Sequence, residues 1–141
     1  MKDIRSAALI PAVAAILAAT PALAQDTELG KEIYLDRCSV CHGAEGGGDG
    51  VVGELLARRP KNLKLLAKDN GGEFPFEAVY QSIDGRSLIA GHGNPDMPIW
   101  GEFFMTQALE DRAVNPKDAR HVVEGRILSV VYFIESLQVT E

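Results

Sequence analysis

The last third of the chain carries the clearest hydrophobic pattern. Apolar side chains recur there at intervals of three and four residues, which is the spacing of one face of an α-helix. Asn115 and Pro116 precede this stretch and suit the cap and the first position of a helix. The pattern predicts a long C-terminal helix with a buried stripe of Val123, Ile127, Val130, Val131, Ile134 and Leu137.

A second helical pattern begins with a cap at residue 26 or 27 and is predicted to run to Cys38. Leu29 and Ile33 form an i, i+4 apolar pair within it. Gly30 inside this helix costs about 1 kcal/mol relative to alanine. Because two backbones approach closely only where no side chain intervenes, we expect another helix to cross at Gly30.

Three shorter segments between these two helices also have helical patterns. They are residues 63–68, residues 75–83 and the stretch that follows Trp100. Glycine-containing turns at 70–72 and 84–85 separate them. With no repeat and no low-complexity tract, the sequence predicts one all-α domain over residues 25–141.

The first 24 residues have the features of a secretory signal peptide. Lys2 and Arg5 give a positive start, residues 7–19 are apolar, and residues 22–24 have the small-x-small form of a cleavage site. An uncleaved membrane anchor is the alternative, but the apolar segment falls short of the roughly 20 residues of a spanning helix. We therefore expect cleavage after Ala24, export to the periplasm and no membrane span in the mature protein.

The chain of 141 residues has a formal net charge of -6. An acidic surface argues against nucleic acid as a partner. One stretch is nevertheless basic and contains Arg58, Arg59, Lys61, Lys64 and Lys68. This stretch either steers an acidic docking partner or is a solvated helix face near a turn.

The two cysteines of the chain lie in the motif Cys38-Ser-Val-Cys41-His42. A disulfide between them would leave His42 without a role, and a thioredoxin-like centre needs a βαβ context that is missing here. Structural zinc needs four protein ligands, and there is no second cysteine pair. The motif C-x-x-C-H is instead typical of covalent haem attachment, with Cys38 and Cys41 forming thioethers and His42 acting as proximal iron ligand.

A glycine-rich stretch follows the motif directly. Gly48, Gly50 and Gly53 fit the letters of the G-x-G-x-x-G pattern, but no strand precedes them, so a dinucleotide site is not supported. Glycine permits positive φ and a close approach of the backbone to a bulky group. Two interpretations stay open, which are a loop along the haem edge and a plain flexible loop.

A six-coordinate haem iron needs a second axial ligand. Met97 lies in a loop stiffened by prolines, which can present its sulfur at a fixed position. Met105 lies in a helical pattern, where methionine usually fills the core, and His121 is expected to be exposed. His92, in the same loop as Met97, would give bis-histidine ligation. We favour Met97, whose sulfur would raise the reduction potential.

These residues resemble the class I c-type cytochromes, which are small exported proteins with one haem. In that family a glycine and, four residues later, an aromatic residue precede C-x-x-C-H, and Gly30 and Tyr34 match them. The resemblance implies a cytochrome c fold, in which short helices and loops surround one covalently bound haem c. It also implies that the N- and C-terminal helices cross, with Tyr132 as the aromatic residue that crosses the glycine.

The distal loop of that family has a methionine followed by proline, with a tryptophan shortly after. Met97, Pro98 and Trp100 match this pattern. By resemblance, Pro60 would offer its carbonyl to the Nδ1 proton of His42. Trp100 would lie near a haem propionate.

Together, the residues and the resemblance predict a periplasmic electron carrier that cycles between ferric and ferrous states, with His42 and Met97 as axial ligands. We expect no enzymatic activity, a monomer, and transient docking with redox donors and acceptors. One alternative is a haem c subunit of a larger exported oxidoreductase. The other is a ligand-binding or catalytic haem with a labile distal ligand.

Overall fold

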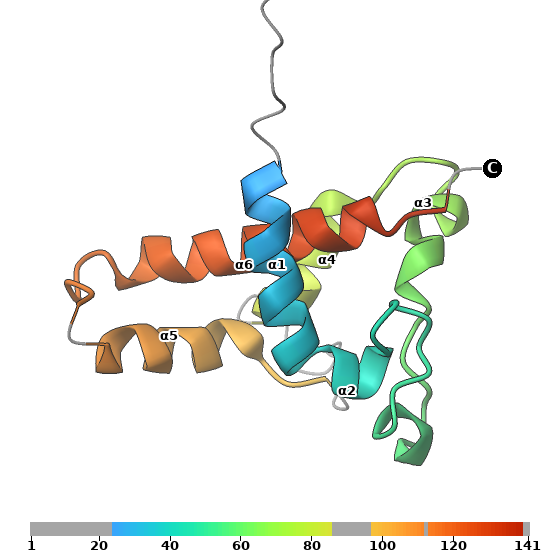
Figure 1. Ribbon diagram of the computed structural model, residues 1–141, viewed down its shortest axis with the longest axis horizontal. Helices are drawn as coiled ribbons and strands as arrows, with labels where there is room; N and C mark the ends of the chain where they lie inside the picture. Colours follow the sequence, from blue (N-terminus) through green and yellow to red (C-terminus); the bar gives the residue numbers. More distant parts are fainter. Residues whose placement is uncertain (1–23, 86–96, 112, 140–141) are drawn as a thin grey trace, which may run out of the picture.

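Two helices that are far apart in the sequence cross one another in the computed structural model (Figure 1). They are α1 (Ala24–Arg37) and α6 (Ala119–Ser136). The structure describes residues 24–85, 97–111 and 113–139. The predicted signal peptide therefore lies outside the described residues except for Ala24, and so does His92.

Shorter helical elements connect the two crossing helices. They are α2 (Ser39–His42), the 3₁₀ turns η1 (Gly53–Leu55) and η2 (Leu63–Leu65), α3 (Leu66–Asp69), α4 (Phe76–Asp84) and α5 (Trp100–Glu110). The described part of the chain contains no strand, which confirms the predicted all-α class. Within that part, no helix combines the length and the apolar character needed to cross a membrane.

The predicted start of the last helix is wrong, since α6 begins at Ala119 and not at Pro116. The side-chain oxygen of Asn115 accepts a hydrogen bond from the backbone N–H of Lys117 at 3.0 Å. The backbone N–H of Asp118 donates to the Asn115 carbonyl at 2.8 Å. Asn115 thus closes a turn ahead of the helix, which is an arrangement that Asn side chains offer in competition with a helical cap.

One hydrophobic core joins α1, α4, α5 and α6. The predicted stripe of the last helix faces this core, and its first five members are at most 3% exposed. Leu137, the last member, is half-buried and packs against the same core. The buried apolar side chains are Tyr34, Val79, Ile83, Phe104, Ala108, Ala119, Val123, Ile127, Val130, Val131, Phe133 and Ile134.

Gly30 lies where α1 meets α6, as the sequence predicts. A Cβ atom at this position would overlap the carbonyl oxygen of Ser129 and would lie 3.0 Å from the Cβ of Phe133. The two backbones are therefore in direct contact, and only glycine leaves room for that contact.

The aromatic residue that packs at this crossing is Phe133, so the prediction of Tyr132 is wrong. The ring of Phe133 lies 5.1 Å from the ring of Tyr34. Tyr132 is 38% exposed, and its ring lies 5.2 Å from that of Phe76. Adjacent positions of a helix point about 100° apart, so only one of the two residues can face Tyr34.

The contact at Gly30 predicts that adding a single methyl group there strongly destabilises the protein. Gly30→Ala should lower the free energy of unfolding by about 1–3 kcal/mol, because the added Cβ forces α1 away from α6. Gly125→Ala is the matched control on α6, since a Cβ there meets nothing within 4 Å. It should leave stability unchanged or raise it by up to about 1 kcal/mol. Guanidinium denaturation of the purified proteins measures both, and equal midpoints would contradict the backbone contact.

Candidate haem site

The residues of the C-x-x-C-H motif form a single helical turn directly after α1. The backbone N–H of Cys38 donates to the Tyr34 carbonyl at 2.8 Å, so the motif continues the hydrogen-bond pattern of that helix. The N–H groups of Cys41 and His42 both donate to the carbonyl of Cys38, at 3.1 and 2.9 Å. Positions three apart in a helical turn share one side, so the two cysteines face the same direction.

Both cysteines are free thiols and half-buried. Cys38 packs against the hydrophobic core. Burial raises the pKa of the Cys38 thiol to about 12, and the neighbouring Cys41 adds to the increase. The unmodified side chain is therefore a neutral thiol at pH 7, located at the edge of an apolar region.

His42 has one ring nitrogen committed to the protein and one available. Its Nδ1 lies 3.3 Å from the carbonyl oxygen of Lys61. Because a carbonyl can only accept, Nδ1 carries the proton and Nε2 keeps its lone pair. Burial lowers the pKa of His42, with the hydrogen bond to Lys61 acting in the opposite direction. The imidazole is therefore neutral at pH 7, which is the form that binds a metal.

The carbonyl that faces His42 belongs to Lys61, so the carbonyl role predicted for Pro60 is wrong by one residue. The Pro60 carbonyl faces Gly48 instead, where a Cβ atom would come within 2.6 Å of its oxygen. The Pro60 ring lies against Gly53. A backbone carbonyl carries no signature in the residue type, so no sequence signal distinguishes Lys61 from Pro60 as the acceptor.

The glycine-rich stretch folds back onto the motif and satisfies its backbone carbonyls. Gly48 N–H donates to the His42 carbonyl at 2.8 Å, and Gly50 N–H donates to the Cys41 carbonyl at 3.2 Å. Val52 N–H reaches the carbonyl of Val40 at 3.0 Å. These are carbonyls at the end of a helical turn, which lack partners within the helix.

Close approach explains the glycines of this stretch. A Cβ at Gly50 would come within 2.6 Å of the Cys41 carbonyl oxygen, and one at Gly53 would overlap the same atom. Gly48 also has a φ of 82°, in the left-handed region. The stretch thus supports the motif through backbone hydrogen bonds and close contacts.

Tyr34 fixes the start of the glycine-rich stretch, a role that sequence reasoning missed. Its hydroxyl donates to the carbonyl of Gly43 at 2.7 Å, and its side chain is fully buried. Burial raises the pKa of the Tyr34 phenol well above its ordinary value, so the hydroxyl stays a neutral donor. A tyrosine on the buried face of α1 was the available signal, because a buried hydroxyl requires a partner.

Met97 and Trp100, both predicted to lie on the distal side, are found just before α5 and at its first residue. Met97 is half-buried and packs against the hydrophobic core, and Met105 does the same within the helix. Trp100 is the first residue of α5, and its ring lies 5.5 Å from that of Phe103. The guanidinium of Arg37 lies 5.0 Å from the centre of the Phe103 ring. Arg37 immediately precedes Cys38, so this contact links the attachment turn to the helix that follows Met97.

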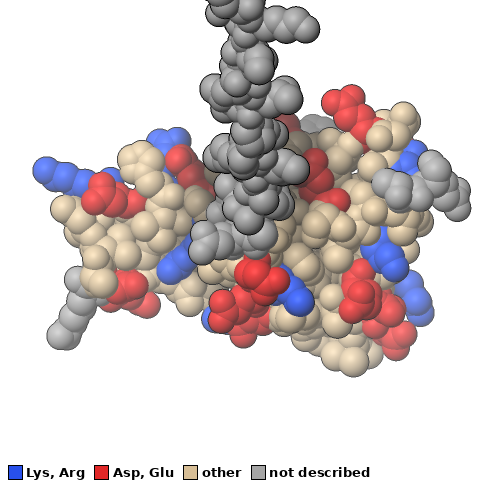
Figure 2. Space-filling model, turned by 45° about the horizontal axis from the view of Figure 1, so that its top comes forward, with Lys and Arg blue, Asp and Glu red and all other residues tan. Residues whose placement is uncertain are grey.

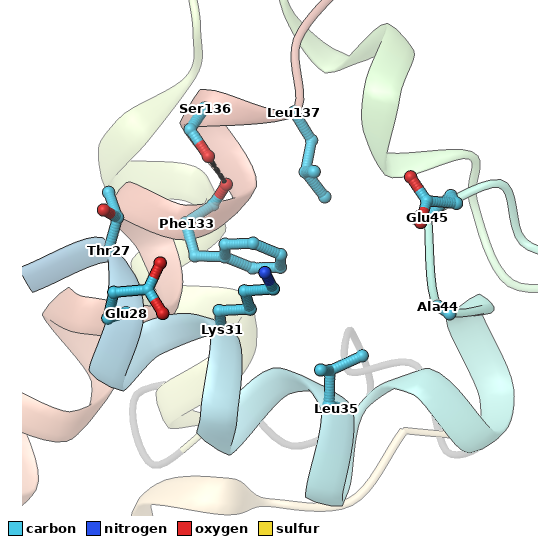
Figure 3. A pocket seen from close by; sticks show the side chains of 9 residues that line it. All are labelled: Thr27, Glu28, Lys31, Leu35, Ala44, Glu45, Phe133, Ser136 and Leu137. Carbon is cyan, nitrogen blue, oxygen red and sulfur yellow. Dashed lines mark hydrogen bonds between the residues drawn. The ribbon is translucent and has the colours of Figure 1, made fainter. Parts of the chain in front are cut away.

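A surface hollow of about 390 Å³ lies elsewhere, between α1, the start of the glycine-rich stretch and the end of α6 (Figure 3). Lys31 and Glu28 of α1 line it, together with Phe133 and Leu137 of the last helix. None of the predicted haem-site residues contributes to this hollow. The hollow is therefore separate from the attachment turn.

The sequence model of the family described as cytochrome c matches residues 27–124, which is well over half of the chain. This protein belongs to the cytochrome c family. Members of the family carry covalently attached haem c and transfer electrons through it. No curated protein matches this cytochrome, and no solved structure matches it either.

The side chains of this cytochrome fit the cofactor of its family. Cys38 and Cys41 offer two thiols on one side of a helical turn, and both are unpaired. His42 offers an Nε2 lone pair, because Lys61 holds its other nitrogen. A histidine held in this way has a fixed tautomer and a more basic ligating nitrogen.

Because Tyr34→Phe removes the hydroxyl that bonds the Gly43 carbonyl, we expect it to lower the free energy of unfolding by a measurable amount. The substitution keeps the ring against Phe133 but removes one of two donors to the Gly43 carbonyl, which keeps the backbone N–H of Gly46 at 3.2 Å. The expected loss is therefore that of a single hydrogen bond, about 0.5–1.5 kcal/mol. Tyr132→Phe is the control, because that residue is 38% exposed. Its free energy of unfolding should remain within about 0.5 kcal/mol of that of the original protein. Thermal or guanidinium unfolding of both haem-containing variants provides the comparison, and equal losses would argue against the buried bond.

Proposed function

We propose that this cytochrome is a periplasmic carrier of single electrons, with haem c attached to Cys38 and Cys41 and with His42 and Met97 as axial ligands. The observation that carries the proposal is the attachment turn, in which two thiols and one available imidazole nitrogen lie within five residues. When bound there, haem c supplies a couple between ferric and ferrous iron.

Export is supported by the sequence of the first 24 residues. A positive start, an apolar segment and a small-x-small site are the three parts of a secretory signal. Thioether attachment also suits an exported chain with two cysteines, since neither thiol then remains exposed to oxidation in that compartment. We infer that the secretory signal is cleaved after Ala24.

Met97 is the proposed distal ligand because its surroundings restrict its position. Pro98 follows it directly, and α5 begins at Trp100. The aromatic rings at the start of α5 contact one another, with Trp100 lying 6.0 Å from Phe104. Arg37 stacks on Phe103 and so connects this segment to the residue before Cys38. A methionine that is followed by a proline and then by an anchored helix loses little freedom on binding a metal, which supports ligation.

A histidine and a methionine in the two axial positions would leave no coordination site for a substrate. The protein is then suited to electron exchange with other redox proteins through brief contacts. Acidic and basic side chains are interspersed over the face seen in Figure 2, and the chain has a net charge of -6. We infer that this cytochrome acts as a monomer without enzymatic activity.

Optical spectra of the exported protein test the ligation. The oxidised form should have a far-red sulfur-to-iron charge-transfer band, and the reduced form should have a c-type spectrum and should not bind carbon monoxide. Met97→Ala should abolish the band and allow carbon monoxide to bind. Met105→Ala is the matched control, because that methionine is also half-buried against the core, and it should keep both properties.

Two results would overturn this proposal. If the original protein lacks the band and binds carbon monoxide, the haem is open to ligands and Met97 is not bound to it. If Met105→Ala abolishes the band while Met97→Ala keeps it, the distal ligand has been assigned to the wrong methionine.

A further inference from the structure

The most exposed large hydrophobic side chains of the described residues lie close together in one turn. Leu55 is 83% exposed and Val51 is 77% exposed. Val52, between them, is 38% exposed. A single exposed leucine or valine is ordinary on a protein surface. Three within five residues form an apolar projection, which is unusual outside contact sites.

This projection belongs to a closed loop. The ring of Pro60 lies against Gly53, where a Cβ would come within 3.0 Å of the Pro60 Cγ. This contact between Gly53 and Pro60 closes the segment that carries Leu55, and Val51 and Val52 lie directly before it. We name residues 51–61 the 51–61 loop, and η1 is the green helical turn at the lower right of Figure 1.

The loop is basic although the protein is acidic. Arg58, Arg59 and Lys61 are exposed and positively charged, whereas Glu54 is the one acidic residue of the loop. The whole chain has a net charge of -6. The loop thus combines an apolar tip with a local excess of positive charge.

Both ends of the loop contact residues of the attachment turn. Gly53 lies directly against the carbonyl oxygen of Cys41. The carbonyl of Lys61 accepts the hydrogen bond from His42 Nδ1 at 3.3 Å. The loop is therefore anchored on a proposed thioether residue through Gly53 and on the proposed proximal ligand through Lys61.

We propose that the 51–61 loop is the docking surface for a redox protein that presents an apolar depression rimmed by carboxylates. This inference rests on the electron-carrier function proposed above. The apolar tip, which includes Leu55, would be buried in the contact. Arg58 and Arg59 would steer the approach, since opposite charges accelerate encounter and fix orientation. A small contact with a charged rim suits a complex that must dissociate quickly.

The test uses stopped-flow reduction of the ferric protein by the hydroquinone of a flavodoxin, a small acidic redox protein, as the probe. Leu55→Ala should lower the second-order rate constant about threefold or more at both low and high salt. Its control is Leu109→Ala on α5, which removes a leucine that is also exposed, at 54%. The control should react at the rate of the original protein.

A second pair of variants tests whether the positive charge of the loop accelerates the encounter with the partner. Arg58→Glu should slow the reaction about threefold or more at low salt and by less than twofold at high salt, because salt screens exposed charges. Lys117→Glu makes the same charge change ahead of α6 and should have a much smaller effect. All variants should keep the absorption spectrum of the original protein and its rate of reduction by ascorbate.

Several outcomes would overturn the docking surface and leave the carrier function intact. One is that the loop variants react no more slowly than their controls, and another is that the original rate does not fall as salt is added. A third is that Leu55→Ala abolishes sedimentation with phosphatidylglycerol vesicles while the flavodoxin rate stays unchanged, which would make the loop a membrane contact. Carbon monoxide binding by the original reduced protein is a different result, because it removes the carrier function itself.

Discussion

The backbone contact between α1 and α6 at Gly30 is the constraint on which the rest of this cytochrome depends. Gly30 and Tyr34 lie four residues apart on one face of α1, and Cys38, four residues later, continues its hydrogen-bond pattern directly after the helix. The contact at Gly30 brings the ring of Tyr34 against Phe133, and it carries Cys38 to the edge of the core. The position of the attachment turn is therefore determined by a contact two helical turns away, without any side chain of the motif being involved.

Tyr34 in turn positions the loop that supports the motif. The hydroxyl of Tyr34 holds the Gly43 carbonyl, and the glycine-rich stretch then returns along the motif with its N–H groups directed at the motif carbonyls. Every unpaired carbonyl near an apolar site would cost free energy, so this pairing allows a short helical turn to end beside the core. The glycines are needed because their backbone lies where side chains would otherwise collide with Cys41.

The sequence predicted the features that depend on side-chain pattern. Helical periodicity identified the buried stripe of α6, and the cost of Gly30 in a helix correctly indicated a crossing. The predictions from sequence failed where the deciding partner is a backbone group, and where two neighbouring aromatic residues could each fill the same position. Tyr132 and Phe133 are both aromatic, and only the rotation of α6 decides which one meets Tyr34. The acceptor for His42 is a carbonyl of Lys61, which any residue type could supply.

The hydrogen bond between His42 and Lys61 connects ligand chemistry to the outer surface. An acceptor at Nδ1 increases the basicity of the opposite nitrogen, so the position of the Lys61 carbonyl would influence a haem iron bound by His42 as proposed. The same residue ends the 51–61 loop, whose tip is exposed and whose other end lies against Cys41. A change in the loop backbone can therefore reach the proposed proximal ligand through one hydrogen bond. The basic side chains of the loop point to an electrostatic role at the surface, whereas its backbone has a structural role at the site, and a single short segment combines the two.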